Sequence, residues 1–157
     1  MTRLALGSDS AGLALKEIVG DHLRARGIAV VDFGVCGDED TDYPDVARTV
    51  AEQVAAGSFD RAILICGTGI GMAIVANKVP GVRAAVCHDP YSAERARKSN
   101  DAQVMALGAR VVGPELAKSL TDIWLASEFE GGRSSTKVAK IVSMDMARRT
   151  SQAPPGL

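Results

Sequence analysis

The chain has 157 residues, 46% of them hydrophobic and 24% charged, which is the size and composition of one folded domain. The formal net charge of −1, with both signs spread along the chain, argues against nucleic acid or a membrane surface as partner. No apolar run reaches the roughly 18 residues of a membrane span. The first strand is expected almost at the amino terminus, with no room for a signal peptide, so we expect a cytoplasmic protein.

Cysteine usage also indicates a reducing compartment. Cys36, Cys66 and Cys87 are widely spaced, with no C-x-x-C pair and no spacing typical of a zinc site. We therefore interpret them as reduced thiols and expect no metal.

Hydrophobic periodicity divides the chain into alternating strands and helices. Apolar runs predict strands at 4–7, 28–33, 62–65, 82–87 and 104–107. Amphipathic stripes with their start and stop residues predict helices at 13–26, 45–56, 71–77, 90–98, 114–125 and 135–148. Gly27 ends the first helix as a C′ glycine would, and Asp89 with Pro90 begins the fourth. We expect one domain over 1–149 and a flexible tail over 150–157.

Strict alternation of strands and helices predicts an α/β fold with three layers, a Rossmann-like, doubly wound, five-stranded parallel sheet. We expect the common strand order 2-1-3-4-5, in which strands one and three adjoin at the switch point where ligands bind. This order places Asp9 and Ser10 opposite Cys66 and Thr68. The last helix has no strand to return to, so we expect it to pack on a partner subunit in a homodimer, with a tetramer left open.

The turn after the third strand is the strongest functional signal. In Ile65-Cys66-Gly67-Thr68-Gly69-Ile70-Gly71, three glycines allow φ > 0 and bring bare backbone N–H groups towards a ligand. A helix that begins near Gly71 adds unpaired N–H groups and a positive dipole end, so the turn is expected to form an anion cradle. Cys66 lies at its mouth, where that positive end favours the thiolate. The alternative is a tight turn beside a buried, inert cysteine.

Other polar groups are expected around this turn. The acidic loop that ends at Tyr43 is typical of a solvated surface, although Tyr43 is placed to lean over a pocket. Asn100, after the fourth helix, adds an amide, while Arg110, Arg133 and Lys137 are candidate sources of positive charge.

Two other chemistries fit these residues less well. Neither His22 nor His88 is placed for a serine triad, although His88 lies at a strand end on the crevice side. The glycines follow G-x-G-x-G rather than G-x-G-x-x-G and come after the third strand, and no G-K-[ST] is present. Nucleotide binding is therefore a minor alternative.

Six motifs occur in order between residues 3 and 142. They are Asp42-Tyr43-Pro44, Ile65-Cys66-Gly67-Thr68-Gly69-Ile70-Gly71, Ala76-Asn77-Lys78-Val79-Pro80-Gly81-Val82-Arg83-Ala84, Asn100-Asp101, Gly108-Ala109-Arg110-Val111 and Glu130-Gly131-Gly132-Arg133. In this order they resemble the ribose-5-phosphate isomerase type B and galactose-6-phosphate isomerase family. The resemblance implies an isomerase of aldose and ketose sugar phosphates that needs neither metal nor cofactor. It also implies a doubly wound sheet and a site between two subunits.

The resemblance implies a catalytic role for two side chains. Cys66 matches the base that moves a proton between C1 and C2 of the sugar, and Thr68 matches a residue that shuttles protons between the two oxygens. The N–H groups of residues 67–71 would stabilise the cis-enediolate intermediate.

Binding roles follow in the same way. Asp9 and Asn100 match groups that hold sugar hydroxyls, and Arg110 matches a phosphate ligand. Arg133 and Lys137 match basic positions donated by the neighbouring chain, although Lys137 is often arginine in the family and would act here as a point charge. We also expect substrate contacts from Ser10, Tyr43, Gly67, Gly69, Ile70, Gly71 and Ser99.

Departures from the family pattern bear on the substrate. Enzymes acting on ribose 5-phosphate usually carry histidine where this chain has Ser10, Ser99 and Ser134, and the histidine before Asn100 is the family's ring opener. Serine cannot perform that acid–base work near neutral pH. A tetrose 4-phosphate carries phosphate on the oxygen that would close a furanose ring, so it needs no ring opener.

The patterns around Ser10 and Ser99 also resemble the erythritol-pathway branch of the family. We therefore expect interconversion of D-erythrulose 4-phosphate and D-erythrose 4-phosphate, with ribose 5-phosphate isomerisation as the alternative. The alternative outside enzymes is a sugar-phosphate or nucleotide sensor, which keeps the anion cradle but needs no base.

Overall fold

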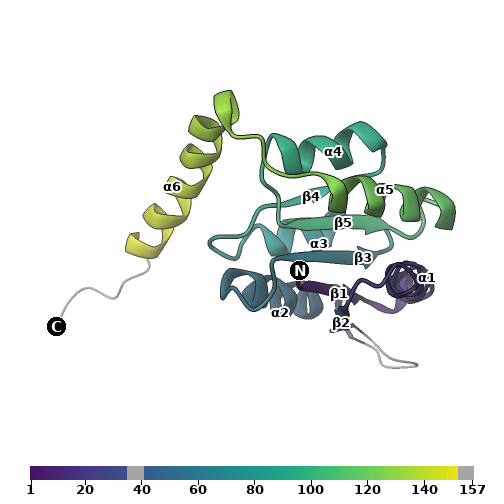
Figure 1. The fold of residues 1–157 in the computed structure, drawn as a ribbon. Coiled ribbons are helices and arrows are strands. Elements are labelled where there is room, and N and C mark those ends of the chain that lie inside the picture. Colours follow the sequence, from purple (N-terminus) through teal and green to yellow (C-terminus); the bar gives the residue numbers. More distant parts are fainter. Residues whose placement is uncertain (35–40, 152–157) are drawn as a thin grey trace.

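The structure is a computed structural model that describes residues 1–34 and 41–151, and it leaves the side chains of 149 and 150 undescribed. Its centre is a five-stranded parallel sheet (Figure 1). The strands are β1 (Leu4–Ser8), β2 (Val30–Asp32), β3 (Arg61–Cys66), β4 (Ala84–Val86) and β5 (Val104–Gly108). Among the described helices, none has the length and apolar character that a membrane crossing requires.

Six α-helices and two short 3-10 turns connect and flank the strands. The helices are α1 (Leu13–Ala25), α2 (Tyr43–Ala55), α3 (Ile70–Ala76), α4 (Pro90–Lys98), α5 (Pro114–Ala126) and α6 (Ser135–Ser151). The 3-10 turns are η1 (Ser10–Gly12) and η2 (Gly132–Ser134). Of the tail expected at 150–157, α6 reaches Ser151 and residues 152–157 lie outside the described part.

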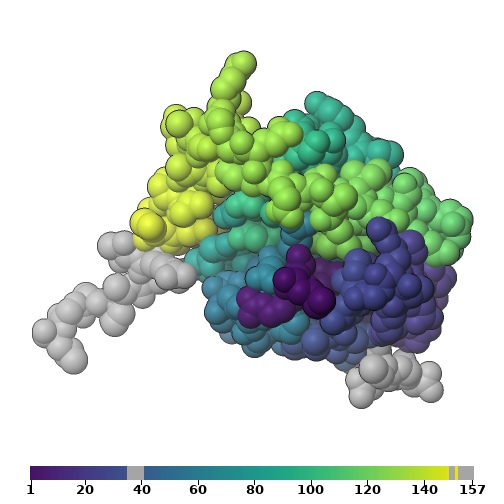
Figure 2. Space-filling model, viewed as in Figure 1, coloured from purple at the N-terminus to yellow at the C-terminus, as the bar shows by residue number. Residues whose placement is uncertain are grey.

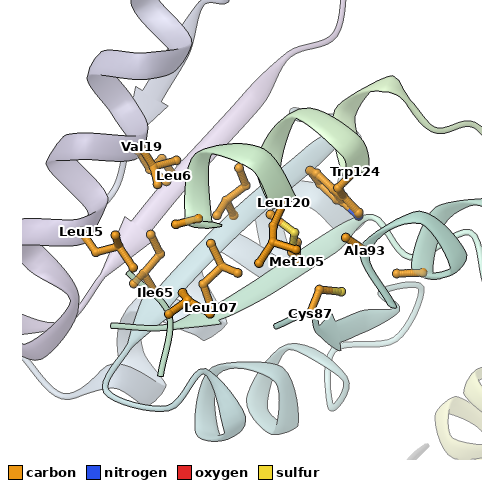
Figure 3. Close-up of a cluster of buried hydrophobic side chains, with 14 of the residues drawn as sticks. Leu6, Leu15, Val19, Ile65, Cys87, Ala93, Met105, Leu107, Leu120 and Trp124 are labelled. Carbon is orange, nitrogen blue, oxygen red and sulfur yellow. The ribbon is translucent and has the colours of Figure 1, made fainter. Parts of the chain in front are cut away.

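Two apolar clusters fill the spaces between the sheet and its helices. The first lies under α1, α4 and α5, and includes Leu6, Val19, Met105, Leu120 and Trp124 (Figure 3). The second lies under α2 and α3, and includes Val50, Leu64, Met72 and Ala106. All six residues of β3 are buried, because this central strand is covered on both faces. The predicted fold class, a doubly wound three-layer α/β sheet, is confirmed.

The order of the last two strands differs from the prediction. The sheet runs β2-β1-β3-β5-β4, so β5 pairs with β3 and β4 forms the edge, whereas 2-1-3-4-5 was expected. Burial explains the difference: all five residues of β5 are buried, whereas the three residues of β4 are all partly exposed. A strand apolar on both faces gains most in the interior of a sheet, and a short strand suits the edge.

Helix α6 stands apart from the three layers. It projects from the end of the α5 connection (Figure 1) and forms the yellow lobe at the left of the space-filling view (Figure 2). A hydrogen bond from Gly81 N–H to Asp145 Oδ2 (2.8 Å) joins it to the loop before β4. Ile141, Met144 and Met146 on this helix are 37%, 63% and 66% exposed. These apolar side chains are the surface that the sequence predicted would pack on a second subunit.

Two leucines of α5 test the packing of the first cluster. Leu120 is fully buried, so Leu120→Ala should lower the free energy of unfolding by about 2–5 kcal/mol through lost burial and a residual cavity. Leu116, on the same helix, is 39% exposed, so Leu116→Ala is the matched control and should cost about 1 kcal/mol or less. Urea unfolding measures both, and equal costs would contradict the packing described.

Candidate active site

An open cleft of about 560 Å³ lies at the carboxyl ends of β1, β3 and β5. This is the switch point of the sheet, because the chain leaves β1 towards β2 on one side and returns to β3 on the other. The cleft is lined by Asp9, Ala11, Tyr43, Cys66, Gly67, Thr68, Ile70, Gly71, Ile74 and Arg110. Eight of these ten residues were expected as site residues from the sequence; Ala11 and Ile74 were not.

Close backbone packing explains the glycines of the turn between β3 and α3. Gly69 has φ +75°, and a Cβ there would lie 2.9 Å from the backbone of Leu107 in β5. In return, a Cβ on Gly108 would lie 2.7 Å from the backbone of Thr68. Both contacts are closer than real Cβ atoms allow. The turn and the end of β5 can therefore pack this closely only with glycine at positions 69 and 108.

Cys66 ends β3 at the floor of the cleft. It is 4% exposed, and its Sγ accepts a hydrogen bond from Gly69 N–H (3.1 Å). A backbone N–H directed at sulfur stabilises negative charge on it, as does the start of α3 just beyond. The sulfur therefore lies at the cleft with one backbone N–H directed at it.

Arg110 lies beside the same turn. Its N–H donates to Gly67 O (3.0 Å), and Ala109 N–H donates to Cys66 O (2.8 Å). Its guanidinium lies over Gly67, where an added Cβ would be 3.5 Å from Nη1. The corrected strand order makes this possible, since β5 and not β4 borders β3. A fixed cation beside bare N–H groups is suited to an anion such as phosphate.

Asp9 and Tyr43 form the other wall. Asp9 Oδ1 accepts from Gly12 N–H (3.0 Å) and so caps η1, and a Cβ on Gly12 would lie 2.3 Å from Ile65 O, which places this turn against the end of β3. Tyr43, 40% exposed, lies across Gly71, where a Cβ would be 2.4 Å from the ring. Ser10 is exposed next to Asp9 and does not line the cleft.

Ser99, Asn100, Arg133 and Lys137 lie elsewhere. The segment that carries Ser99 and Asn100 leads into β5, whose first residue Val104 pairs with Ala62, near the start of β3. These two residues therefore lie near the amino edge of the sheet, opposite the edge that holds Cys66. Among the residues that the structure describes, none of the four lines the cleft of its own chain.

These residues nevertheless lie on neighbouring segments. Glu130 N–H donates to Lys98 O (3.1 Å), and the Glu130 carboxylate lies 3.6 Å from Lys98 Nζ. The end of α4, with Ser99 and Asn100, is thus held beside the linker that leads to Arg133 in η2 and Lys137 in α6. The residues predicted for the site thus form two separate sets on different parts of the chain.

His88 makes a contact that the sequence did not predict. Its Nε2 accepts a hydrogen bond from Gly108 N–H (2.9 Å), and burial lowers the pKa of its ring against the opposing effect of Asp89. No local sequence pattern marks this contact, because it joins a side chain to the backbone N–H of a residue 20 positions further along the chain. Within the described residues, no group of three His, Cys, Asp or Glu side chains fits a metal ion.

Comparison with known proteins decides the family. The sequence profile of the Ribose/Galactose Isomerase family matches residues 4–141. The chain belongs to this family. The resemblance inferred from the sequence is confirmed, and with it the expectation of an enzyme, an isomerase of the aldose–ketose type.

Individual family members are similar over almost their whole length. A protein named D-erythrulose-4-phosphate isomerase from Pectobacterium atrosepticum is 57% identical over 142 residues, 90% of this chain and 93% of that protein. Ribose-5-phosphate isomerase B of Escherichia coli is 48% identical, covering 94% of this chain and 99% of that one. The structure of Clostridium thermocellum ribose-5-phosphate isomerase B matches with a TM-score of 0.90 at 50% identity, covering 93% and 99% of the two chains.

The two described cysteines should differ sharply in reactivity. Burial, together with Asp89, raises the pKa of the Cys87 thiol to about 12, so about one Cys87 in 10⁴ is ionised at pH 8. Cys66 opens on the cleft and accepts an N–H. Iodoacetamide at pH 8 should therefore modify Cys66 well before Cys87, as measured by mass spectrometry of the peptides. Equal rates at the two cysteines would contradict the environments described.

Proposed function

We propose that this isomerase interconverts D-erythrulose 4-phosphate and D-erythrose 4-phosphate without metal or cofactor, with Cys66 as the base. One observation carries the mechanism: the Cys66 sulfur accepts the Gly69 N–H at the floor of a cleft whose wall holds Arg110. A base, an oxyanion site and a phosphate ligand thus line one cleft, where a single sugar phosphate can contact all three.

The proton transfer uses groups of the turn. The Cys66 thiolate takes the proton from C1 of the ketose or C2 of the aldose, and the electron pair of that C–H bond forms the C1–C2 double bond of a cis-enediolate. The N–H groups of residues 67–71 that do not donate to Cys66 or Thr68 hold the negative oxygen. Thr68 Oγ1 accepts from Ile70 N–H (3.3 Å), which leaves its own proton to move between O1 and O2. The Cys66 thiol then returns its proton to the other carbon.

Binding groups orient the sugar above that turn. Arg110 holds the phosphate, and Asp9 and Tyr43 border the carbon chain, with Asp9 accepting from a sugar hydroxyl. Ser10, next to Asp9, contributes from the rim. Gly67, Gly69, Ile70 and Gly71 supply the backbone of the oxyanion site.

We further propose that the site is completed by a second copy of the chain. Ser99, Asn100, Arg133 and Lys137 lie outside the cleft of their own chain, yet on segments held together near Lys98 and Glu130. A homodimer that brings this set to the partner's cleft adds an amide for sugar hydroxyls and two cations for phosphate. The exposed apolar side chains of α6 support the same assembly, with a tetramer left open. We place this enzyme in the cytoplasm.

Serine at position 99 supports the shorter sugar. A pentose 5-phosphate closes into a furanose and requires a group that opens the ring, and serine is a poor acid–base group near neutral pH. D-Erythrose 4-phosphate cannot form that ring. The 57% identity with the Pectobacterium D-erythrulose-4-phosphate isomerase favours the same substrate, whereas 48–52% identity with ribose-5-phosphate isomerases B keeps ribose 5-phosphate as the alternative.

Loss of the base tests the mechanism. Cys66→Ala should lower kcat by about 10³-fold or more, because the proton acceptor is gone, while the melting temperature stays close to wild type. Cys87→Ala, which removes a buried thiol on the α4 and α5 side of the sheet, is the matched control and should keep most of the activity. A Cys66→Ala variant with near-normal turnover would contradict the role of Cys66 as the base.

Substrate choice is tested by competing sugars on one preparation. We expect kcat/KM for D-erythrulose 4-phosphate to exceed that for ribose 5-phosphate by tenfold or more, which is about 1.4 kcal/mol of transition-state preference. Ser99→His should raise kcat/KM for ribose 5-phosphate, whereas the control Ser99→Asn should not. A tenfold preference of the wild type for ribose 5-phosphate would overturn the substrate proposal.

Mixed dimers test the shared site. Cys66→Ala and Arg133→Ala damage different halves of one site, so each variant alone should be strongly impaired. After subunit exchange, half of the dimers should be mixed, each with one intact site, which predicts about a quarter of wild-type activity. Exchange can be followed by native mass spectrometry. No recovery despite proven exchange would mean that each site is built from one chain.

A further inference from the structure

The hydrogen bond from Gly108 N–H to His88 lies just beyond the point where the backbone pairing of β4 with β5 ends. β4 ends at Val86, which pairs with Ala106, and one further backbone bond runs from Cys87 N–H to Ala106 O (3.1 Å). Ala109 N–H points to β3, where it donates to Cys66 O, and Gly108 N–H therefore points to the β4 side. The His88 imidazole accepts this N–H in place of the missing carbonyl.

Gly108 in turn supports the turn that carries Cys66. It pairs in register with Cys66, and its Cα packs against the backbone of Thr68. The next two residues, Ala109 and Arg110, donate to Cys66 O and Gly67 O. His88 thus contacts a backbone unit whose other neighbours are the base and the phosphate ligand.

We propose that neutral His88 is a positioning residue of this site, which holds the end of β5, and through it Cys66 and Arg110, in the reactive arrangement. A backbone N–H only donates, so Nε2 must be unprotonated to accept, and the ring proton lies on Nδ1. Protonation of His88 adds a proton to Nε2, so that two donors, Nε2–H and Gly108 N–H, face each other. The hydrogen bond to Gly108 is then lost. The inference deepens the proposed function, on which its kinetic arm rests.

The surroundings of His88 keep it neutral near pH 7. Burial lowers the pKa of the ring below its usual 6.5, and this outweighs the Asp89 carboxylate, which acts in the opposite sense. The Asp89 pKa is itself lowered by hydrogen bonds from Ser92, so this carboxylate stays ionised throughout. The neighbouring Cys87 thiol is neutral, with its pKa raised to about 12.

The elements that pack on His88 bring little further charge. On the β5 side, Leu107–Ala109 is uncharged and Arg110 is turned towards Gly67. On the α4 side, the first charged residue after Asp89 is Glu94, which is paired with Lys98. The Gly108 hydrogen bond is therefore complete above pH 6.5 and is lost as the pH falls through the lowered pKa of His88.

The kinetic test uses His88→Ala and His88→Gln. At pH 8 we expect His88→Ala to lower kcat about tenfold with a smaller change in KM, and His88→Gln, whose amide oxygen accepts without titrating, to recover most of the loss. Between pH 8 and pH 5 the wild-type advantage over His88→Ala should shrink towards one. An unchanged kcat in His88→Ala, or a ratio that is constant from pH 5 to 8, would overturn the proposal.

A second arm needs no substrate. The rate of Cys66 alkylation by iodoacetamide at pH 7, mapped by mass spectrometry, reports the turn directly. We expect His88→Ala to slow it several-fold and His88→Gln to restore it, whereas rates within twofold of wild type in His88→Ala would overturn the proposal. If this pattern appears and the wild type isomerises no sugar phosphate, the proposed function fails and the positioning role stands.

Discussion

The cleft depends on the close approach of two backbone segments, the turn after β3 and the end of β5. Gly69 packs against Leu107, and Gly108 packs against Thr68, at distances that leave no room for side chains. Hydrogen bonds from Ala109 and Arg110 to the carbonyls of Cys66 and Gly67 continue the contact beyond the sheet. Within this turn, Gly69 N–H reaches the Cys66 sulfur and Ile70 N–H reaches Thr68 Oγ1. The proposed base, oxyanion site and phosphate ligand therefore lie on two segments that are packed against each other.

Much of this arrangement could be predicted from the sequence, for identifiable reasons. The continuous apolar run of β3 indicated a central strand, and the glycines after it indicated a turn at the edge where ligands bind. The expectation that the first and third strands adjoin in the sheet placed Asp9, which follows the first strand, opposite Cys66. Tyr43 was expected to lean over a pocket, and its ring lies across Gly71.

The order of β4 and β5 could not be predicted in the same way. Both segments are apolar and each is preceded by a helix, so local pattern leaves two topologies with similar merit. The choice depends on burial of whole strands, since β5 is covered on both faces and β4 is not. One feature of the site follows from this choice: Arg110 lies beside Gly67 because β5 borders β3. Sequence patterns report which residues can pack inside, but not which neighbours they meet there.

The proposed chemistry is best tested by the fate of the sugar hydrogen in heavy water. Transfer through a thiol base allows exchange with solvent, so D-erythrulose 4-phosphate brought to equilibrium by the wild-type enzyme should gain deuterium at C1, and the D-erythrose 4-phosphate formed at C2. Nuclear magnetic resonance locates the label, and the same incubation with Cys66→Ala should leave both carbons unlabelled. Complete interconversion by the wild type with no deuterium at either carbon would contradict a proton-transfer mechanism and, with it, the role of Cys66.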